Sequence, residues 1–291
     1  MQHIPVLCGP LCDYLDIQPG DIILDGTIGL GGHSQLFLKA LQTGKIFGLD
    51  QDLAAITYCQ KKFENAYSVQ LFHQNFSSFV DLFPQLDIQC VDKIVLDLGF
   101  SSFHLDDSNR GFTFQGTEPL DMRMDASESI HTAAFYLNSL GVRDLSDIFY
   151  HYGELFDNKI LSQTIIQYRR KQKFLTTDQL IEVIKKSYRF KHRKAFIKTT
   201  TQVFQALRIY VNQELEHLKD FLNSLAQFTL PGSRIAIISF HSLEDRIVKH
   251  FLKENNNIFK PLHRGVITAT EAEIQNNSRA HCAKLRCFER L

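Results

Sequence analysis

The sequence predicts an α/β protein with a mostly parallel, doubly wound sheet and an inserted helical domain. Three short apolar runs, Ile22–Asp25, Lys45–Asp50 and Asp92–Asp97, each end in an acid and alternate with helix-compatible segments. Such alternation is typical of a parallel sheet. More than a hundred residues with helical patterns then precede the next clear strand, Ser233–Phe240. An insert between the fourth and fifth strands explains this spacing.

A glycine-rich turn follows the first strand. After Asp25 the chain reads Gly26-Thr27-Ile28-Gly29-Leu30-Gly31-Gly32-His33, and a helix-compatible run extends over 34–41. Glycines allow the backbone to approach a ligand without a Cβ in the way. The dinucleotide fingerprint Gly-x-Gly-x-x-Gly fails here, because Ser34 stands at the third glycine. Asp25 followed by Gly29-x-Gly31 resembles the first motif of class I S-adenosylmethionine methyltransferases, with Thr27 in place of the first glycine.

The ends of the next strands supply candidate ligand contacts. Asp50 ends the second strand, where an acid can accept hydrogen bonds from both ribose hydroxyls. Asn75 and Phe76 follow the predicted third strand, 68–73, and Phe76 either stacks on an adenine or belongs to the core. Asp97 ends the fourth strand and either positions cofactor and substrate or caps the following turn. If these acids serve no ligand, the glycine loop is only a tight turn.

The insert is predicted to be helical and basic. Helical patterns cover 145–152, 155–170 and 201–228, and Thr176-x-x-Gln179 is typical of a capping box that opens a helix over 180–188. Between residues 169 and 198 there are eleven lysines and arginines and two acids, with four interleaved aromatic residues. Basic and aromatic side chains together suit a phosphate backbone and unstacked bases. The alternative is a solvated helix face.

Composition narrows the class of protein. The 291 residues are 44% hydrophobic and carry no net charge, so overall charge identifies no partner. None of the six cysteines forms a Cys-x-x-Cys pair, so we expect reduced thiols and no metal. The amino terminus shows no signal peptide and no membrane span, and we expect a soluble cytoplasmic protein.

The chain contains six longer strings that are too specific to be explained by a local pattern. They are Gly31-Gly32-His33-Ser34, Asp97-Leu98-Gly99-Phe100-Ser101-Ser102, Arg110-Gly111-Phe112-Thr113-Phe114, Pro119-Leu120-Asp121-Met122-Arg123-Met124-Asp125, Phe204-Gln205-Ala206-Leu207-Arg208-Ile209 and Ser239-Phe240-His241-Ser242-Leu243-Glu244-Asp245-Arg246. In this order, over nearly the whole chain, they resemble the bacterial ribosomal RNA small subunit methyltransferase H family.

The resemblance implies an enzyme that methylates the exocyclic amine N(4) of a cytidine in the decoding region of 16S ribosomal RNA. It implies S-adenosyl-L-methionine as cofactor and a class I methyltransferase fold, with domain parts 1–105 and 204–291 and a substrate-recognition insert, 106–203. The implied partner is 16S ribosomal RNA within the small ribosomal subunit, with no membrane. The oligomeric state stays open, a homodimer included.

The resemblance also carries site residues. The implied cofactor contacts are Gly31, Gly32, His33, Asp50, Phe76, Asp97 and His104, and the candidate catalytic residues are Asp97, Asp121, Arg123 and His241. The family usually has Ser-Ser-Pro-Gln where this chain has Ser101-Ser102-Phe103-His104. Asp121, Arg123 and His241 could line the base or phosphate site, although Arg–carboxylate pairs also simply join loops.

Two other functions compete with this one. A nucleotide-dependent oxidoreductase is opposed by Ser34 at the third glycine position. An assembly factor that binds ribosomal RNA without catalysis is opposed by the intact glycines and the acids Asp50 and Asp97. Thermal shifts with each cofactor distinguish a methyltransferase from an oxidoreductase, and a methyl-transfer assay distinguishes it from an assembly factor.

Overall fold

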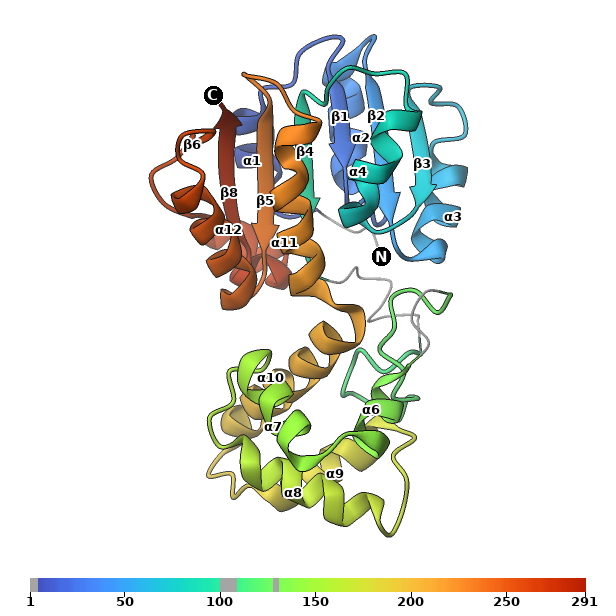
Figure 1. Cartoon of the computed structure of the whole chain (residues 1–291), viewed down its shortest axis with the longest axis vertical. Coiled ribbons are helices and arrows are strands. Elements are labelled where there is room, and N and C mark those ends of the chain that lie inside the picture. The colour runs from blue at the N-terminus through green and yellow to red at the C-terminus, as the bar shows by residue number, and fades with distance from the viewer. Residues whose placement is uncertain (1–4, 100–108, 128–130) are drawn as a thin grey trace. The chain divides into compact units, whose positions relative to one another are not determined.

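The computed structural model describes residues 5–99, 109–127 and 131–291. The chain divides into two compact units. One comprises Met1–Ser101 with Leu215–Leu291, and the other, the insert, comprises Ser102–Glu214 (Figure 1). The six cysteines are free. Over the described residues, we find no helix with the length and hydrophobicity that a membrane span requires.

The first unit is built on a mixed sheet with strand order β3-β2-β1-β4-β5-β8-β6, and β7 pairs with β8. The strands are β1 (Ile22–Asp25), β2 (Lys45–Asp50), β3 (Val69–His73), β4 (Lys93–Asp97), β5 (Arg234–Ser239), β6 (Phe259–Pro261), β7 (Ile267–Thr268) and β8 (Lys284–Arg290). Strands β1 to β5 are parallel, and β8 is antiparallel to β5. The predicted mostly parallel α/β sheet is confirmed, whereas β6, β7 and β8 were not predicted.

Helices cover both faces of this sheet (Figure 1). They are α1 (Cys8–Leu15), α2 (Gly32–Leu41), α3 (Leu53–Lys62), α4 (Phe79–Leu82), α11 (Glu214–Ser224), α12 (Ser242–Glu254) and α13 (Glu271–Asn276), with short 3-10 turns at Phe76–Ser78, Phe83–Gln85, Leu225–Gln227 and Ser278–Cys282.

Neighbouring strand residues belong to opposite faces. Leu24 packs in one core cluster with Phe221 of α11, whereas Ile23 packs in another with Phe37 of α2. The two-residue period of a strand produces this separation, and burial on both faces explains the continuous apolar runs in the sequence.

The insert is helical and has its own core. Its described helices are α6 (Ala133–Ser139), α7 (Val142–His151), α8 (Asn158–Arg169), α9 (Thr177–Ser187) and α10 (Arg193–Asn212). The capping box at α9 is present, and the Gln179 Oε1 accepts a hydrogen bond from the Thr176 N–H at 3.2 Å. Leu145, Phe149, Leu180 and Leu207 are fully buried together.

Two sequence-based boundaries differ from the structure. The helix expected over 201–228 is two helices, because Gln213 adopts a left-handed backbone (φ 49°) that ends α10. Helix α10 continues unbroken to Asn212 and packs in the core of the insert, so the insert extends to Glu214, beyond residue 203.

Candidate active site

Strand β1 ends in a buried acid, Asp25. Asp25 is 2% exposed, and its Oδ2 accepts a hydrogen bond from the Ser34 Oγ at 2.6 Å. Burial raises the pKa of Asp25 to about 6, while the Ser34 hydroxyl and His33 act in the opposite direction. The residue that breaks the dinucleotide fingerprint therefore joins the first strand to the first turn of α2.

The glycine loop approaches its neighbours too closely for larger residues. A Cβ on Gly26 would lie 2.4 Å from the Leu96 Cδ2, and one on Gly31 would lie 2.5 Å from the Phe63 ring. Gly31 also has a left-handed backbone (φ 68°) at the start of α2. Packing and backbone conformation both require glycine at Gly31.

Helix α3 fixes the direction of the loop peptides. The Lys62 Nζ donates to the carbonyl oxygens of Leu30 and Gly31 at 2.8 and 3.1 Å, and the Cys59 Sγ lies 3.2 Å from the Gly29 carbonyl oxygen. The N–H of a trans peptide points away from its C=O. The N–H groups of Leu30 and Gly32 therefore face away from α3. Backbone N–H groups at a helix N-terminus suit a polar or anionic ligand group.

Asp50 ties the end of β2 to this loop. Its Oδ2 accepts a hydrogen bond from the Gly29 N–H at 2.9 Å, and its Oδ1 accepts one from the Asp52 N–H at 2.9 Å. An acid at the end of the second strand of such a sheet can accept hydrogen bonds from ribose hydroxyls. The contact with Gly29 was not foreseen from the sequence.

Phe76 begins the short 3-10 turn that follows β3. It is 9% exposed and meets the Phe221 ring edge-to-face at 5.5 Å, so it contributes to the core. Beside it in sequence, the Asn75 Nδ2 donates to the Gln51 Oε1 at 2.8 Å. This polar pair follows β2 and β3 at the edge where a nucleoside is expected.

Asp97, at the end of β4, is held by two residues of the glycine-loop region. Its backbone N–H donates to the Thr27 Oγ1 at 2.6 Å, and its Oδ2 lies 3.4 Å from the His33 Nε2. Burial alone lowers the pKa of His33, but the Asp97 carboxylate, with Cys8 and Asp25, raises it to about 10. The 3.4 Å contact between the His33 Nε2 and the Asp97 Oδ2 is an electrostatic one, because its geometry is not that of a hydrogen bond. Thr27 replaces a glycine of the usual motif and supplies the hydroxyl contact.

Two buried oxygens at this edge have no hydrogen-bond partner within the described part of the chain, namely the Asp97 Oδ1 and the Ser239 Oγ. Ser239 ends β5 and is 1% exposed. Its neighbour Ile238 is paired in register with Asp97, so both oxygens belong to the same end of adjacent strands. Buried polar atoms rarely stay unpaired, so both point to a ligand. Ser239 was not predicted as a site residue, although its position at the end of an apolar strand is visible in the sequence.

The other candidate catalytic residues have partners of their own. His241 caps α12 through its Nδ1, which accepts from the Glu244 N–H at 3.4 Å, whereas its buried Nε2 lies 3.1 Å from the Glu244 Oε1 without making a hydrogen bond. In the insert, Arg123 binds Asp121 through two hydrogen bonds of 2.7 and 2.8 Å. His104 lies outside the described residues. The structure thus brings together Gly31, Gly32, His33, Asp50 and Asp97.

These features fit an S-adenosyl-L-methionine site. The Leu30 and Gly32 N–H groups face away from α3, Asp50 lies beside this loop at the end of β2, and the Asp97 Oδ1 is buried without a partner among the described atoms. An acceptor for hydroxyls, directed loop amides and an unpaired carboxylate oxygen suit the ribose, amino acid and reacting portions of that cofactor.

Comparison with known proteins also indicates a methyltransferase. The family model described as the MraW methylase family matches residues 1–291. A protein named Ribosomal RNA small subunit methyltransferase H from Trichormus variabilis is 42% identical over 289 residues, covering 99% of this chain and 92% of the relative. One of the same name from Dictyoglomus turgidum is 37% identical over 291 residues, covering 99% and 97%.

Among solved structures, a putative rRNA-methylase from Clostridium thermocellum is similar over 99% of this chain and 100% of its own, with a TM-score of 0.49 and 13% identity. The relative from Trichormus variabilis, at 42% identity, is far more similar in sequence to this chain than this solved structure is, at 13%. The family model extends over the full chain. The chain belongs to the MraW methylase family and has the α/β fold of class I S-adenosyl-L-methionine-dependent methyltransferases.

Proposed function

We propose that this protein methylates the exocyclic amine N(4) of a cytidine in the decoding region of 16S ribosomal RNA, within the small ribosomal subunit. Relatives about 40% identical over nearly the whole chain are named as ribosomal RNA small subunit methyltransferases. The observation that carries the chemistry is the buried, unpaired Asp97 Oδ1 at the end of β4.

Amine methylation requires an acceptor for the amine protons. The lone pair of a cytosine amine is delocalised into the ring, so the amine is a poor nucleophile. The cofactor, when bound, supplies a methyl group already activated on a sulfonium. Asp97 orients the amine by accepting its hydrogen bond, and its negative charge stabilises the positive charge that develops on the nitrogen.

His33 positions this carboxylate. The His33 Nε2 is 3.4 Å from the Asp97 Oδ2, which leaves the Oδ1 to face the amine. The Thr27 hydroxyl fixes the Asp97 backbone at the same time. Gly31, Gly32 and Asp50 hold the cofactor, with Phe76 beneath it.

Asp121, Arg123 and His241 are secondary candidates for contacts with the base or phosphate. His104 is a candidate cofactor contact by family resemblance. Asp121, Arg123 and His241 each have an intramolecular partner in the structure. We therefore expect them to shape the loops that contact the base or phosphate. The target cytidine must leave its stack to reach a cofactor held at the sheet edge.

The direct test maps methylated cytidines in ribosomal RNA from cells that lack this protein. We expect one N(4)-methylated cytidine of the decoding region to disappear and to return when the wild-type chain is supplied. A methylation map identical to that of wild-type cells contradicts the assignment.

The role of Asp97 is tested by Asp97→Asn, which keeps the size of the side chain but removes its charge. Turnover should fall by about 10²–10³, the scale of losing one preorganised electrostatic contact, while cofactor affinity changes much less. Single-turnover methyl transfer to small ribosomal subunits, at saturating cofactor and RNA, measures this. The exposed Asp13→Asn is the control. Transfer at the wild-type rate would make Asp97 a binding residue only.

A further inference from the structure

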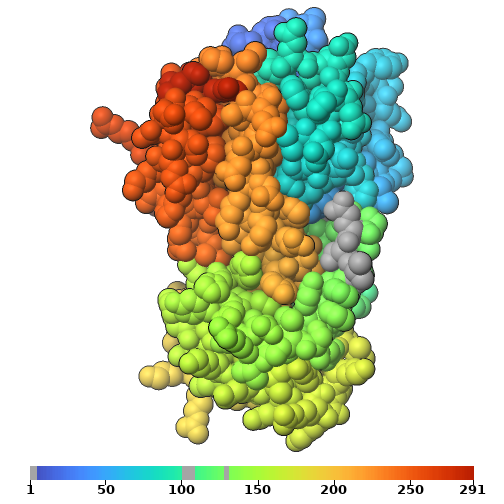
Figure 2. Space-filling view, viewed as in Figure 1, coloured from blue at the N-terminus to red at the C-terminus, as the bar shows by residue number. Residues whose placement is uncertain are grey.

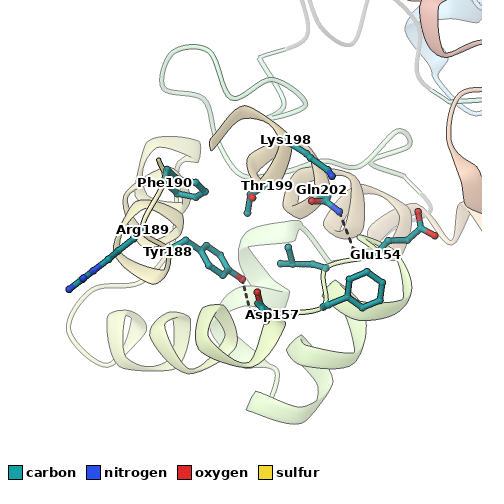
Figure 3. A pocket seen from close by; sticks show the side chains of 10 residues that line it. Glu154, Asp157, Tyr188, Arg189, Phe190, Lys198, Thr199 and Gln202 are labelled. Carbon is teal, nitrogen blue, oxygen red and sulfur yellow. Dashed lines mark hydrogen bonds between the residues drawn. The ribbon is translucent and has the colours of Figure 1, made fainter. Parts of the chain in front are cut away.

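We propose that a hollow on the insert binds one unstacked nucleotide of the RNA substrate, with its base inside and its phosphates at the rim. The hollow has a volume of about 330 Å³. Its walls come from the turn before α8, the turn between α9 and α10, and the amino-terminal half of α10 (Figure 3). This inference rests on the proposed action on RNA and names a second contact for that substrate.

Aromatic side chains line the hollow. Phe156 is 80% exposed, and its ring meets that of Tyr150 edge-to-face at 6.0 Å, so most of the Phe156 side chain is open to solvent. Tyr188 and Phe190 belong to the wall between α9 and α10, with ring centroids 5.9 Å apart (Figure 3). Exposed aromatic rings in a basic surface are the platforms on which unstacked bases bind.

The walls are held in place before any ligand arrives. The Tyr188 hydroxyl donates to the Asp157 carbonyl oxygen at 2.8 Å, and the Gln202 Nε2 donates to the carbonyls of Gly153 and Glu154 at 3.0 and 3.2 Å. A Cβ on Gly153 would lie 2.8 Å from the Gln202 carbonyl oxygen. The turn therefore packs directly on α10, and a preformed hollow loses little freedom when a base enters.

The charges favour a nucleotide over an apolar ligand. Arg189 and Lys198 are exposed lining residues. The segment 189–198 contains five lysines and arginines and no acid, and side chains coloured as this segment project from the insert in Figure 2. The lining also contains Glu154 and Asp157. A carboxylate accepts hydrogen bonds from the amine of a base, whereas it would repel a phosphate, so the base enters the hollow and the phosphates follow the basic rim.

The test measures binding of a fluorescent single-stranded RNA oligonucleotide to the full chain by anisotropy, at several salt concentrations. Phe156→Ala should weaken binding about 5- to 100-fold, the range expected from losing one stacked base. The salt dependence should stay the same, because no phosphate contact is lost. Phe156→Trp should restore affinity. Arg189→Ala should reduce the salt slope by about one counterion.

Two controls accompany these variants. Tyr67→Ala removes an aromatic side chain that is 97% exposed in the first unit, and Lys171→Ala removes an exposed charge of the insert outside the hollow. Tyr67→Ala should leave RNA affinity unchanged, and Lys171→Ala should change it less than Arg189→Ala does.

The outcomes separate this inference from the proposed function. If wild-type protein methylates small subunits and Phe156→Ala binds RNA as wild type does, the nucleotide site is refuted and the methyltransferase stands. If Phe156→Ala weakens binding to intact subunits but not to naked RNA, the occupant is a ribosomal protein and the inference fails. If wild-type protein binds RNA through Phe156 but transfers no methyl group, the proposed function fails instead.

Discussion

The carboxylate of Asp50 bridges two turns, because one oxygen accepts from Gly29 and the other from Asp52. Any ribose hydroxyl it binds therefore meets an acid already fixed by two backbone amides. Such preorganisation reduces the entropy lost on binding. The same bonds make Asp50 a structural residue, so its test must separate lost affinity from lost folding.

Asp50→Ala removes charge-assisted hydrogen bonds worth roughly 1.5–3 kcal/mol each. Affinity for S-adenosyl-L-methionine, measured by calorimetry, should fall at least tenfold. A thermal melt checks that the protein remains folded, and Asp50→Asn, which keeps one carbonyl acceptor, should lose less. Unchanged affinity in folded Asp50→Ala protein would remove this residue from the cofactor site.

His33 makes stability depend on pH. Its pKa in the folded chain, about 10, is above the ordinary value of about 6.5, so folding favours the protonated ring. The resulting stabilisation is complete below pH 6.5 and is lost as pH rises from 6.5 to 10. In urea titrations at pH 6, 8 and 10, the free energy of unfolding should fall less steeply for His33→Gln than for wild type. Parallel pH profiles of the two proteins would contradict the ion pair with Asp97.

At the scale of elements, the basic segment combines structural and exposed charges. The Arg169 Nη1 donates to the carbonyls of Leu137 and Leu140 at 2.9 and 2.6 Å and so joins α6 to α8. In contrast, Lys191, Arg193 and Lys194 are exposed around the start of α10. The eleven basic residues found in the sequence therefore do not all contribute to one RNA-binding surface.

Changing Lys191, Arg193 and Lys194 together to glutamate should weaken RNA binding and flatten its salt dependence, because fewer counterions are released. Affinity for the cofactor should stay as in wild type. The matched control changes three exposed lysines of the first unit, Lys45, Lys61 and Lys253, to glutamate. If both triple variants bind RNA equally at low salt, the segment is a solvated face.

At the scale of the whole molecule, the chain has separate cores. The insert packs around Phe149 and its neighbours, whereas the sheet packs around residues such as Phe47 and Phe37. Each unit can therefore lose stability through its own core. Strands and glycine loop belong to one unit, so the cofactor site depends on the sheet core.

Phe149→Ala should cost about 3–5 kcal/mol in the stability of the insert, because Phe149 is fully buried. RNA binding should be lost at lower temperature than in wild type, while calorimetry should still detect the cofactor. Phe47→Ala, in the sheet core, should instead impair cofactor binding. Equal loss of cofactor binding in both variants would show that the two units unfold as one.

The sequence alone was sufficient to predict the sheet strands β1 to β5, the glycine loop, the acids Asp25, Asp50 and Asp97, and the family. Each of these features depends on residues close together in the sequence, because the apolar run, the glycines and the terminal acid belong to one strand–turn–helix unit. Tertiary structure alone decided the antiparallel β8, the Thr27 and His33 contacts to Asp97, the unpaired Ser239 oxygen and the hollow beside Phe156. Such contacts join residues distant in the chain, and packing, which local patterns do not encode, selects them.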